Sequence, residues 1–154
     1  MFELDVAKAA DGKHVAIAHG LTDDYLRHWE IYDAPQMSER TSKWFTAQKL
    51  CSCSSGGLST MSLADITERL KEDEAIIAIF DLYNLWSAAA AFAQEVKELI
   101  ADRHELWNRI LIECYFQDQV EVVSLVSTGI NIIFCVKDMA ARRYSEFYIC
   151  LYYQ

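Results

Sequence analysis

The chain has 154 residues, 53% of them hydrophobic and 24% charged, and its formal net charge at pH 7 is -9. A chain of this length and composition can bury one core without disulfide or metal staples, so we expect a single globular domain over residues 1–154. Its acidity disfavours direct binding to nucleic acid or to an anionic membrane, because both require Lys and Arg side chains that face phosphate groups.

The cysteines number five, an odd count, and most lie in apolar runs, which is typical of reduced core residues. Glu3 and Asp5 interrupt the first apolar residues and no basic segment precedes them, which argues against a signal peptide. We therefore expect a cytoplasmic location.

The N-terminal residues have the pattern of a hairpin. Apolar residues alternate with polar or small ones over residues 2–6 and again at Val15 and Ile17. This period of two predicts strands, and Asp11-Gly12 between them predicts the turn that joins two antiparallel strands.

Two helices are expected after this hairpin. Thr22 is a favourable N-cap for the first, which Asp33-Ala34-Pro35 would end. Ser62 and Asp65 match the pattern of a capping box and predict the start of the second helix. Residues 36–60 between them show no convincing period, and residues 51–60 are predicted to form a loop.

Residues 75–93 are mostly apolar, but Asp81 near the centre argues against a membrane-spanning helix. The β-branched residues Ile76, Ile77 and Ile79 fit a buried strand over residues 75–82, and the start of a long buried helix fits as well. The alanine run at residues 88–91 favours a helix. One unbroken helix over residues 74–113 would measure about 60 Å, so we expect a break near Asn84 or near residue 94.

Residues 95–113 have the clearest helical period in the chain. Apolar residues recur at three- and four-residue steps, which places them on one face of a helix, and acidic residues fall on the opposite face. Arg103 would lie within the apolar face, where an unpaired charge is costly. An ion pair between Arg103 and Asp81 would remove that cost.

After Tyr115 the period changes from helical to alternating. Residues 119–126, 130–136 and 144–153 are predicted to form three strands, and the short connections between them favour an antiparallel meander. The predicted fold class is therefore α+β: an antiparallel sheet, made of the N-terminal hairpin and the C-terminal three-stranded meander, covered on one face by helices.

No motif for catalysis, metal binding or cofactor binding accompanies these elements. The four histidines have none of the spacings that place zinc ligands on one helix or knuckle, and only one residue separates Cys51 from Cys53. The loop at residues 54–60 resembles phosphate-binding loops in its glycines but lacks their lysine. We assign no catalytic, metal-binding or cofactor-binding residue and expect no cofactor.

The preferred hypothesis is a non-enzymatic, acidic binding protein that inhibits a protein partner with a basic surface, such as a nucleic-acid-binding protein. Immunity proteins and phage anti-defence inhibitors form this class. The residues expected to bind the partner are acidic: Glu95, Glu98, Asp102, Glu105, Glu113, Asp118 and Glu121.

Two other classes fit the same sequence. The first is a small enzyme that uses Cys51, Cys53 or a histidine together with the Ser/Gly loop at residues 54–60. The second is a homodimeric structural or interaction subunit in which the aromatic strand over residues 147–153 pairs across an exposed sheet edge. Thiol-dependent turnover would identify the enzyme, and light scattering would identify the dimer.

Overall fold

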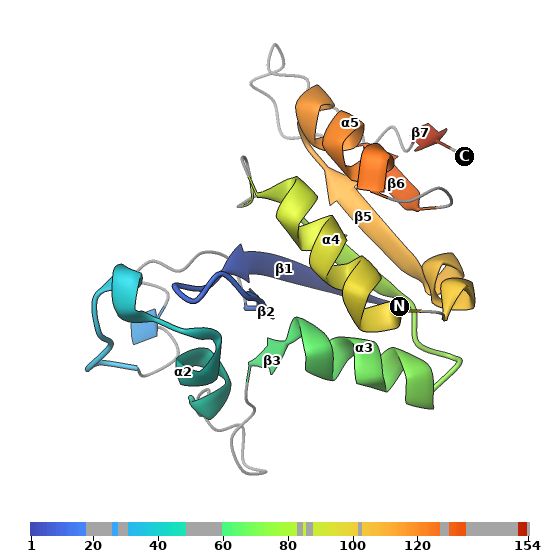
Figure 1. The fold of residues 1–154 in the computed structure, drawn as a ribbon. Helices are drawn as coiled ribbons and strands as arrows, with labels where there is room; N and C mark the ends of the chain where they lie inside the picture. The colour runs from blue at the N-terminus through green and yellow to red at the C-terminus, as the bar shows by residue number, and fades with distance from the viewer. Residues whose placement is uncertain are drawn as a thin grey trace, which may run out of the picture.

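The computed structural model describes residues 1–17, 26–27, 31–48, 60–82, 85, 88–101, 103–126, 130–134 and 151–153, whose arrangement is shown in Figure 1. The strands in this part of the chain are β1 (Phe2–Lys8), β2 (His14–Ala16), β3 (Met61–Ser62), β4 (Ala78–Asp81), β5 (Ile110–Cys114), β6 (Asn131–Phe134) and β7 (Leu151–Tyr153). The helices are η1 (Met37–Glu39), α2 (Ser42–Ala47), α3 (Leu63–Glu72), α4 (Ala89–Ile100), η2 (His104–Arg109) and α5 (Gln117–Val126), of which η1 and η2 are 3-10 helices.

The described strands form one sheet in the order β3-β2-β1-β4-β5-β6-β7. Its centre is parallel, because β1 pairs with β4, β4 with β5, and β5 with β6. The outer pairs, β1 with β2, β2 with β3 and β6 with β7, are antiparallel. The predicted α+β fold with an antiparallel sheet is therefore wrong, since the central strands are joined by helical crossovers, as parallel neighbours require.

Helices α3, α4 and α5 lie side by side over one face of the sheet (Figure 1). Side chains alternate between the two faces of a strand, so the register decides which residues meet the helices. We call the side toward the helices the helical face. It is apolar and buried, and it comprises Val6, Ala78, Phe80, Ile110, Ile112 and Ile132.

A second, smaller apolar cluster lies where the N-terminal hairpin meets α2. Ala9, Val15 and Phe45 are its buried members. The hairpin forms as expected, and Gly12 in its turn has a φ of 82°, a left-handed conformation that glycine adopts without strain. Helix α2 falls in the segment for which the sequence shows no period.

Helix α3 begins as the sequence predicts. The Ser62 hydroxyl accepts a hydrogen bond from the Asp65 backbone N–H (3.1 Å), and the Asp65 carboxylate accepts one from the Ser62 backbone N–H (3.0 Å). This reciprocal pair is the predicted capping box. At the other end of the helix, the Arg109 guanidinium donates to the carbonyl groups of Leu70 in the last turn and of Asp73 just after it, at 2.5 and 2.7 Å.

The single helix expected over residues 95–113 is wrong. Helix α4 ends at Ile100, and the next residue, Ala101, has a φ of 46°, which no helix can continue through. The apolar period continues past the break because η2 buries Leu106 and Trp107 and β5 follows at once. Three elements with different geometries therefore share one pattern. Of the two alternative places for a break, residue 94 lies within α4, whereas Asn84 lies outside the described residues, between the end of β4 at Asp81 and the start of α4 at Ala89.

The strand expected over residues 119–126 is also wrong, because these residues belong to α5. Val120 and Val123 are buried at helical spacing, so packing overrides the strand preference of valine. Since α5 is the crossover from β5 to β6, this one error also produced the predicted antiparallel meander.

Three other predictions can be compared with the structure. Residues 78–81 form a strand, which decides between the strand and the helix left open for residues 75–82, and α4, which starts at Ala89, confirms the helix expected from the alanine run. Strand β6 confirms a strand within residues 130–136. The helix after Thr22, apart from residues 26–27, and the loop at residues 51–59 lie outside the described residues. Within the part of the chain that the structure describes, no helix has the length and apolar character needed to cross a membrane.

Candidate functional site

The face of the sheet opposite the helices carries acidic side chains. The register aligns Asp5 of β1 with Asp81 of β4, and Asp81 with Glu113 of β5. Aligned residues point to the same side of a sheet, so these carboxylates form a row that crosses three parallel strands. We call this side the acidic face; it also carries Glu3, Ile79, Leu111 and Ile133.

Three of the carboxylates converge. One oxygen each of Glu3, Asp81 and Glu113 lies within 4.8 Å of the others. Asp81 is 4% exposed and Glu113 is 7% exposed, whereas Glu3 is exposed. Two buried carboxylates at this separation repel each other strongly unless a positive or hydrogen-bonding group lies between them. We call these three residues the carboxylate cluster.

The Tyr115 hydroxyl is one such group. Its oxygen lies 3.0 Å from Asp81 Oδ2 and 3.1 Å from Glu113 Oε1. The hydroxyl carries one hydrogen, so it donates to one carboxylate at a time. Burial, and then the charges of Asp81 and Glu113, raise the pKa of the Tyr115 phenol far above its usual value, so it keeps its proton.

Gln119, a fully buried residue of α5, links the chain segments that follow β4 and β5. Its side-chain oxygen accepts hydrogen bonds from the backbone N–H groups of Tyr115 (2.8 Å) and Phe116 (3.2 Å). Its amide nitrogen donates to the carbonyl group of Leu82 (3.0 Å) and, more weakly, to that of Leu85 (3.4 Å). Gln119 thus fixes the backbone next to Asp81 relative to the backbone that carries Tyr115.

The position of the cluster on the strands is typical of a functional site. Asp81 is the last residue of β4, and Glu113 is the last but one of β5. In folds built from parallel strands and helices, the carboxyl ends of the strands carry the catalytic and binding residues. Carboxylate oxygens are also the ligands that hard divalent cations such as Mg²⁺, Mn²⁺ and Ca²⁺ prefer.

The residues predicted to bind a partner do not form one surface. Glu113 is buried in the carboxylate cluster on β5, and Glu95 of α4 lies 2.6 Å from the His14 ring. Glu98, Glu105, Asp118 and Glu121 are exposed, but they are distributed over α4, η2 and α5. Asp102 lies outside the described residues. The stripe required one continuous helix, which the break at Ala101 removes.

The predicted ion pair between Asp81 and Arg103 is wrong. Arg103 is half exposed and pairs with Glu105, while Asp81 is buried beside Tyr115. Cys51, Cys53, His19 and His28 lie outside the described residues. The described thiol, Cys114, is buried, and burial together with the Glu113 charge raises its pKa to about 12, which makes it unreactive.

Sequence reasoning singled out Asp81 and Glu113 but missed Glu3 and Tyr115 as their neighbours. A usable signal was present, because a short apolar run ends in an acidic residue at both Asp81 and Glu113. Had residues 110–114 been recognised as a strand parallel to β4, these two carboxylates would have been expected side by side.

Comparison with solved structures shows the fold. A glycerophosphodiester phosphodiesterase from Parabacteroides distasonis matches with a TM-score of 0.61 at 16% identity, over 86% of this chain and 50% of that one. A protein assigned as a glycerophosphodiester phosphodiesterase from Galdieria sulphuraria matches with a TM-score of 0.67 at 12% identity, over 90% and 53%. A glycerophosphoryl diester phosphodiesterase from Parabacteroides distasonis matches with a TM-score of 0.54 at 11% identity, over 90% and 44%.

The chain therefore has the fold of part of these phosphodiesterases, and it spans about half of their length. No protein-family model matches the sequence, and no curated protein matches it. The hypothesis of a non-enzymatic inhibitor, immunity protein or anti-defence protein is wrong, since the structures that share this fold are enzymes and the acidic stripe behind the hypothesis does not exist as one surface.

Proposed function

We propose that this chain is a phosphodiesterase domain that binds a divalent cation at Glu3, Asp81 and Glu113 and acts on a phosphodiester. The observation that carries the proposal is the convergence of these three carboxylates on one face of the sheet, with Asp81 and Glu113 at the carboxyl ends of their parallel strands. The shared fold with three phosphodiesterase structures supports the choice of substrate class.

The donor set fits such a cation. All three side chains offer oxygen, two of them are buried, and their oxygens lie within 4.8 Å of one another, close enough to share one ion. A bound divalent cation would attract a phosphate oxygen and offset the negative charge that develops there during hydrolysis. Without added positive charge, the cluster would repel a phosphodiester.

Tyr115 and Gln119 hold the carboxylate cluster in position. Tyr115 keeps its proton and donates to Asp81 or Glu113, which limits the rotation of the carboxylate that accepts the hydrogen bond. Gln119 holds the two segments that bring them together. Glu3 is the exposed member of the cluster, whereas Asp81 and Glu113 are buried.

Two measurements test the proposal. Calorimetric titration of the chain with Mg²⁺, Mn²⁺ and Ca²⁺ should show binding of at least one cation, which Asp81→Asn and Glu113→Gln should each weaken at least tenfold. Asp118→Asn, which removes an exposed carboxylate on α5, is the matched control and should bind as the unmodified chain does.

Hydrolysis of a glycerophosphodiester is then measured with the cation that binds and again with excess chelator. Turnover that requires the cation and is lost in Asp81→Asn supports the proposal. Cation binding without turnover would contradict the phosphodiesterase activity, and absence of binding would contradict the cation site itself.

Several sequence-based expectations stay predictions. They are the cytoplasmic location, the single domain, the protein partner with a basic surface and the homodimer. The expected absence of any cofactor or metal is also untested, and the proposed cation site would contradict it. Cell fractionation, affinity purification and light scattering would test the location, the partner and the dimer.

A further inference from the structure

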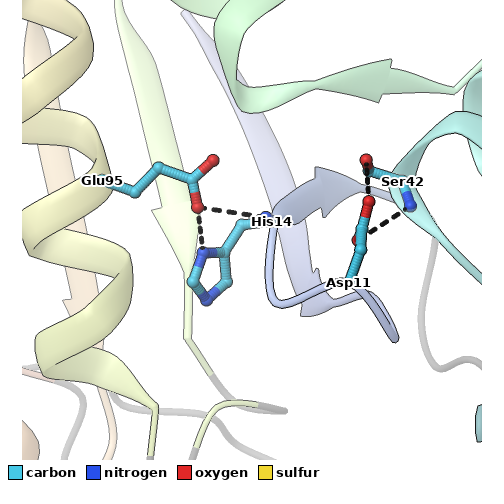
Figure 2. A network of polar contacts seen from close by, with 4 residues as sticks. All are labelled: Asp11, His14, Ser42 and Glu95. Carbon is cyan, nitrogen blue, oxygen red and sulfur yellow. Dashed lines mark hydrogen bonds and ion pairs between the residues drawn. The ribbon is translucent and has the colours of Figure 1, made fainter.

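A buried histidine joins the N-terminal hairpin to α4. His14 of β2 is 1% exposed, and its Nδ1 lies 2.6 Å from Glu95 Oε2 (Figure 2). The same carboxylate oxygen accepts a hydrogen bond from the His14 backbone N–H at 3.2 Å. Since Glu95 lies on α4, this pair ties the main core to a strand on the far side of β1.

The other ring nitrogen has no hydrogen-bond partner among the described residues. His14 Nε2 is fully buried, and the ring meets Phe92 edge to face with centroids 5.5 Å apart. With Glu95 accepting from Nδ1–H, Nε2 is the unprotonated nitrogen of a neutral ring. Protonation at Nε2 would place an N–H donor in an apolar site without an acceptor, which is costly.

The hairpin also holds α2. Asp11 in the turn accepts hydrogen bonds from the Ser42 backbone N–H (3.0 Å) and hydroxyl (2.7 Å), as Figure 2 shows. The Ala10 backbone N–H donates to the Arg40 carbonyl at 2.9 Å. Together with the small apolar cluster of Ala9, Val15 and Phe45, these contacts make one unit. We call β2, its preceding turn and α2 the hairpin unit.

We propose that the His14–Glu95 pair is a proton-sensitive link, through which mild acid loosens the hairpin unit from α4 while the main core stays folded. The geometry favours this division because, among the described residues, the apolar core of the hairpin unit has three buried members, whereas the much larger main core lies under α3, α4 and α5. A small cluster gives the hairpin unit little stability of its own against the loss of one buried contact.

The charges around the ring define the pH range. Burial lowers the pKa of His14 from its ordinary 6.5, Glu95 opposes that shift, and Lys8 of β1 and Lys13 of the turn add to it. β3 has no ionisable side chain, and the buried residues of α2 and α3 are uncharged. Burial raises and the Ser42 hydrogen bonds lower the pKa of Asp11, with a net shift downward, so the contact between Asp11 and Ser42 persists in mild acid.

The sign of the effect follows from these shifts. A released hairpin unit exposes His14, which then binds a proton below about pH 6.5, while the docked unit holds the ring neutral. Docking is therefore fully stable above that pH and weakens as the pH falls toward the lowered pKa. One proton changes the opening equilibrium by up to about tenfold per pH unit.

Hydrogen exchange of the whole chain, measured at about pH 7.5 and about pH 5.5 and corrected for intrinsic rates, tests this link. We expect the opening equilibrium of peptides covering residues 9–17 and 42–47 to rise about three- to tenfold at the lower pH, with no change over residues 110–114. His14→Gln keeps an amide donor for Glu95 but cannot titrate, so the rise should disappear. His104→Gln, at an exposed histidine, is the matched control and should retain it.

A rise of equal size in His14→Gln, or an equal rise over residues 110–114, would overturn the proposal. If His14→Gln fails to fold, the imidazole ¹⁵N chemical shifts of His14 in the unmodified chain test the proposed link instead. They should show a proton on Nδ1 at neutral pH and titrate with the same midpoint as the exchange. A separate midpoint would contradict the link.

Discussion

The two faces of the central sheet differ although the same four strands build both. On the helical face, Phe80 and Ile112 are fully buried under α3, α4 and α5. On the acidic face, their neighbours Asp81 and Glu113 form a row of charge. The helical face contributes hydrophobic free energy to folding, whereas the acidic face gathers groups that folding alone would disfavour. Neighbouring residues on one strand therefore serve different ends: Phe80 and Ile112 stabilise the fold, whereas Asp81 and Glu113 belong to the candidate site.

The largest effect is expected when two single substitutions at adjacent residues of β5 are compared. Ile112→Ala removes a fully buried side chain from the helical face and should lower the free energy of unfolding by about 3 to 5 kcal/mol. Leu111→Ala removes the same number of carbons from the partly exposed acidic face and should cost about 1 to 2 kcal/mol. Denaturant unfolding of both variants measures the difference. Equal losses would mean that the two faces are buried alike.

A smaller effect is expected where Gln119 joins the chain segments that follow β4 and β5. Gln119→Leu removes the side-chain hydrogen bonds to the backbone beside Asp81 and Tyr115, and it should cost about 2 to 3 kcal/mol because buried backbone groups lose their partners. It should also weaken cation binding, since the carboxylates lose their relative position.

Gln117→Leu is the control for this substitution. Gln117 is exposed on the same helix, and its side-chain amide donates to Glu121 at 3.3 Å, an exposed contact, so a change within about 0.5 kcal/mol is expected. Should Gln119→Leu also change stability by less than this amount, the proposed role of Gln119 in joining the two segments would be wrong.

Some elements of the fold could be predicted from the sequence, and others could not. The elements that short local signals define, the hairpin around Gly12 and the capping box of Ser62 and Asp65, were predictable because their causes lie within a few residues. The helical period over residues 95–113 misled because α4, η2 and β5 bury residues against the same core. A pattern of burial records distance from the core and does not show where the backbone turns.

The carboxylate cluster was less predictable for a related reason. Asp81 and Glu113 are 32 residues apart in sequence, and their contact exists because β4 and β5 pair in parallel. A strand over residues 119–126 removes the helical crossover that a parallel pair needs, and the helical period over residues 95–113 separately places Glu113 on the surface of a helix. The candidate site thus depended on topology, while the hairpin and the capping box depended on local chemistry.

The smallest effect on stability is expected from Asp81→Asn, even though Asp81 is 4% exposed. The amide has nearly the same shape and its oxygen can still accept from Tyr115, while one negative charge leaves a cluster of three. Relief of repulsion offsets the altered hydrogen bonding, so without divalent cations the free energy of unfolding should change by less than about 1 kcal/mol.

With a saturating divalent cation, the unmodified chain should instead gain stability that Asp81→Asn does not, by about 2.7 kcal/mol at a cation concentration one hundred times the Kd. Thermal and denaturant unfolding with and without chelator measure both quantities. A loss above about 2 kcal/mol in chelator would show that the Asp81 carboxylate is a structural partner within the fold. Asp81 on the acidic face would then stabilise the fold as residues of the helical face do, and the proposed difference between the two faces would be wrong.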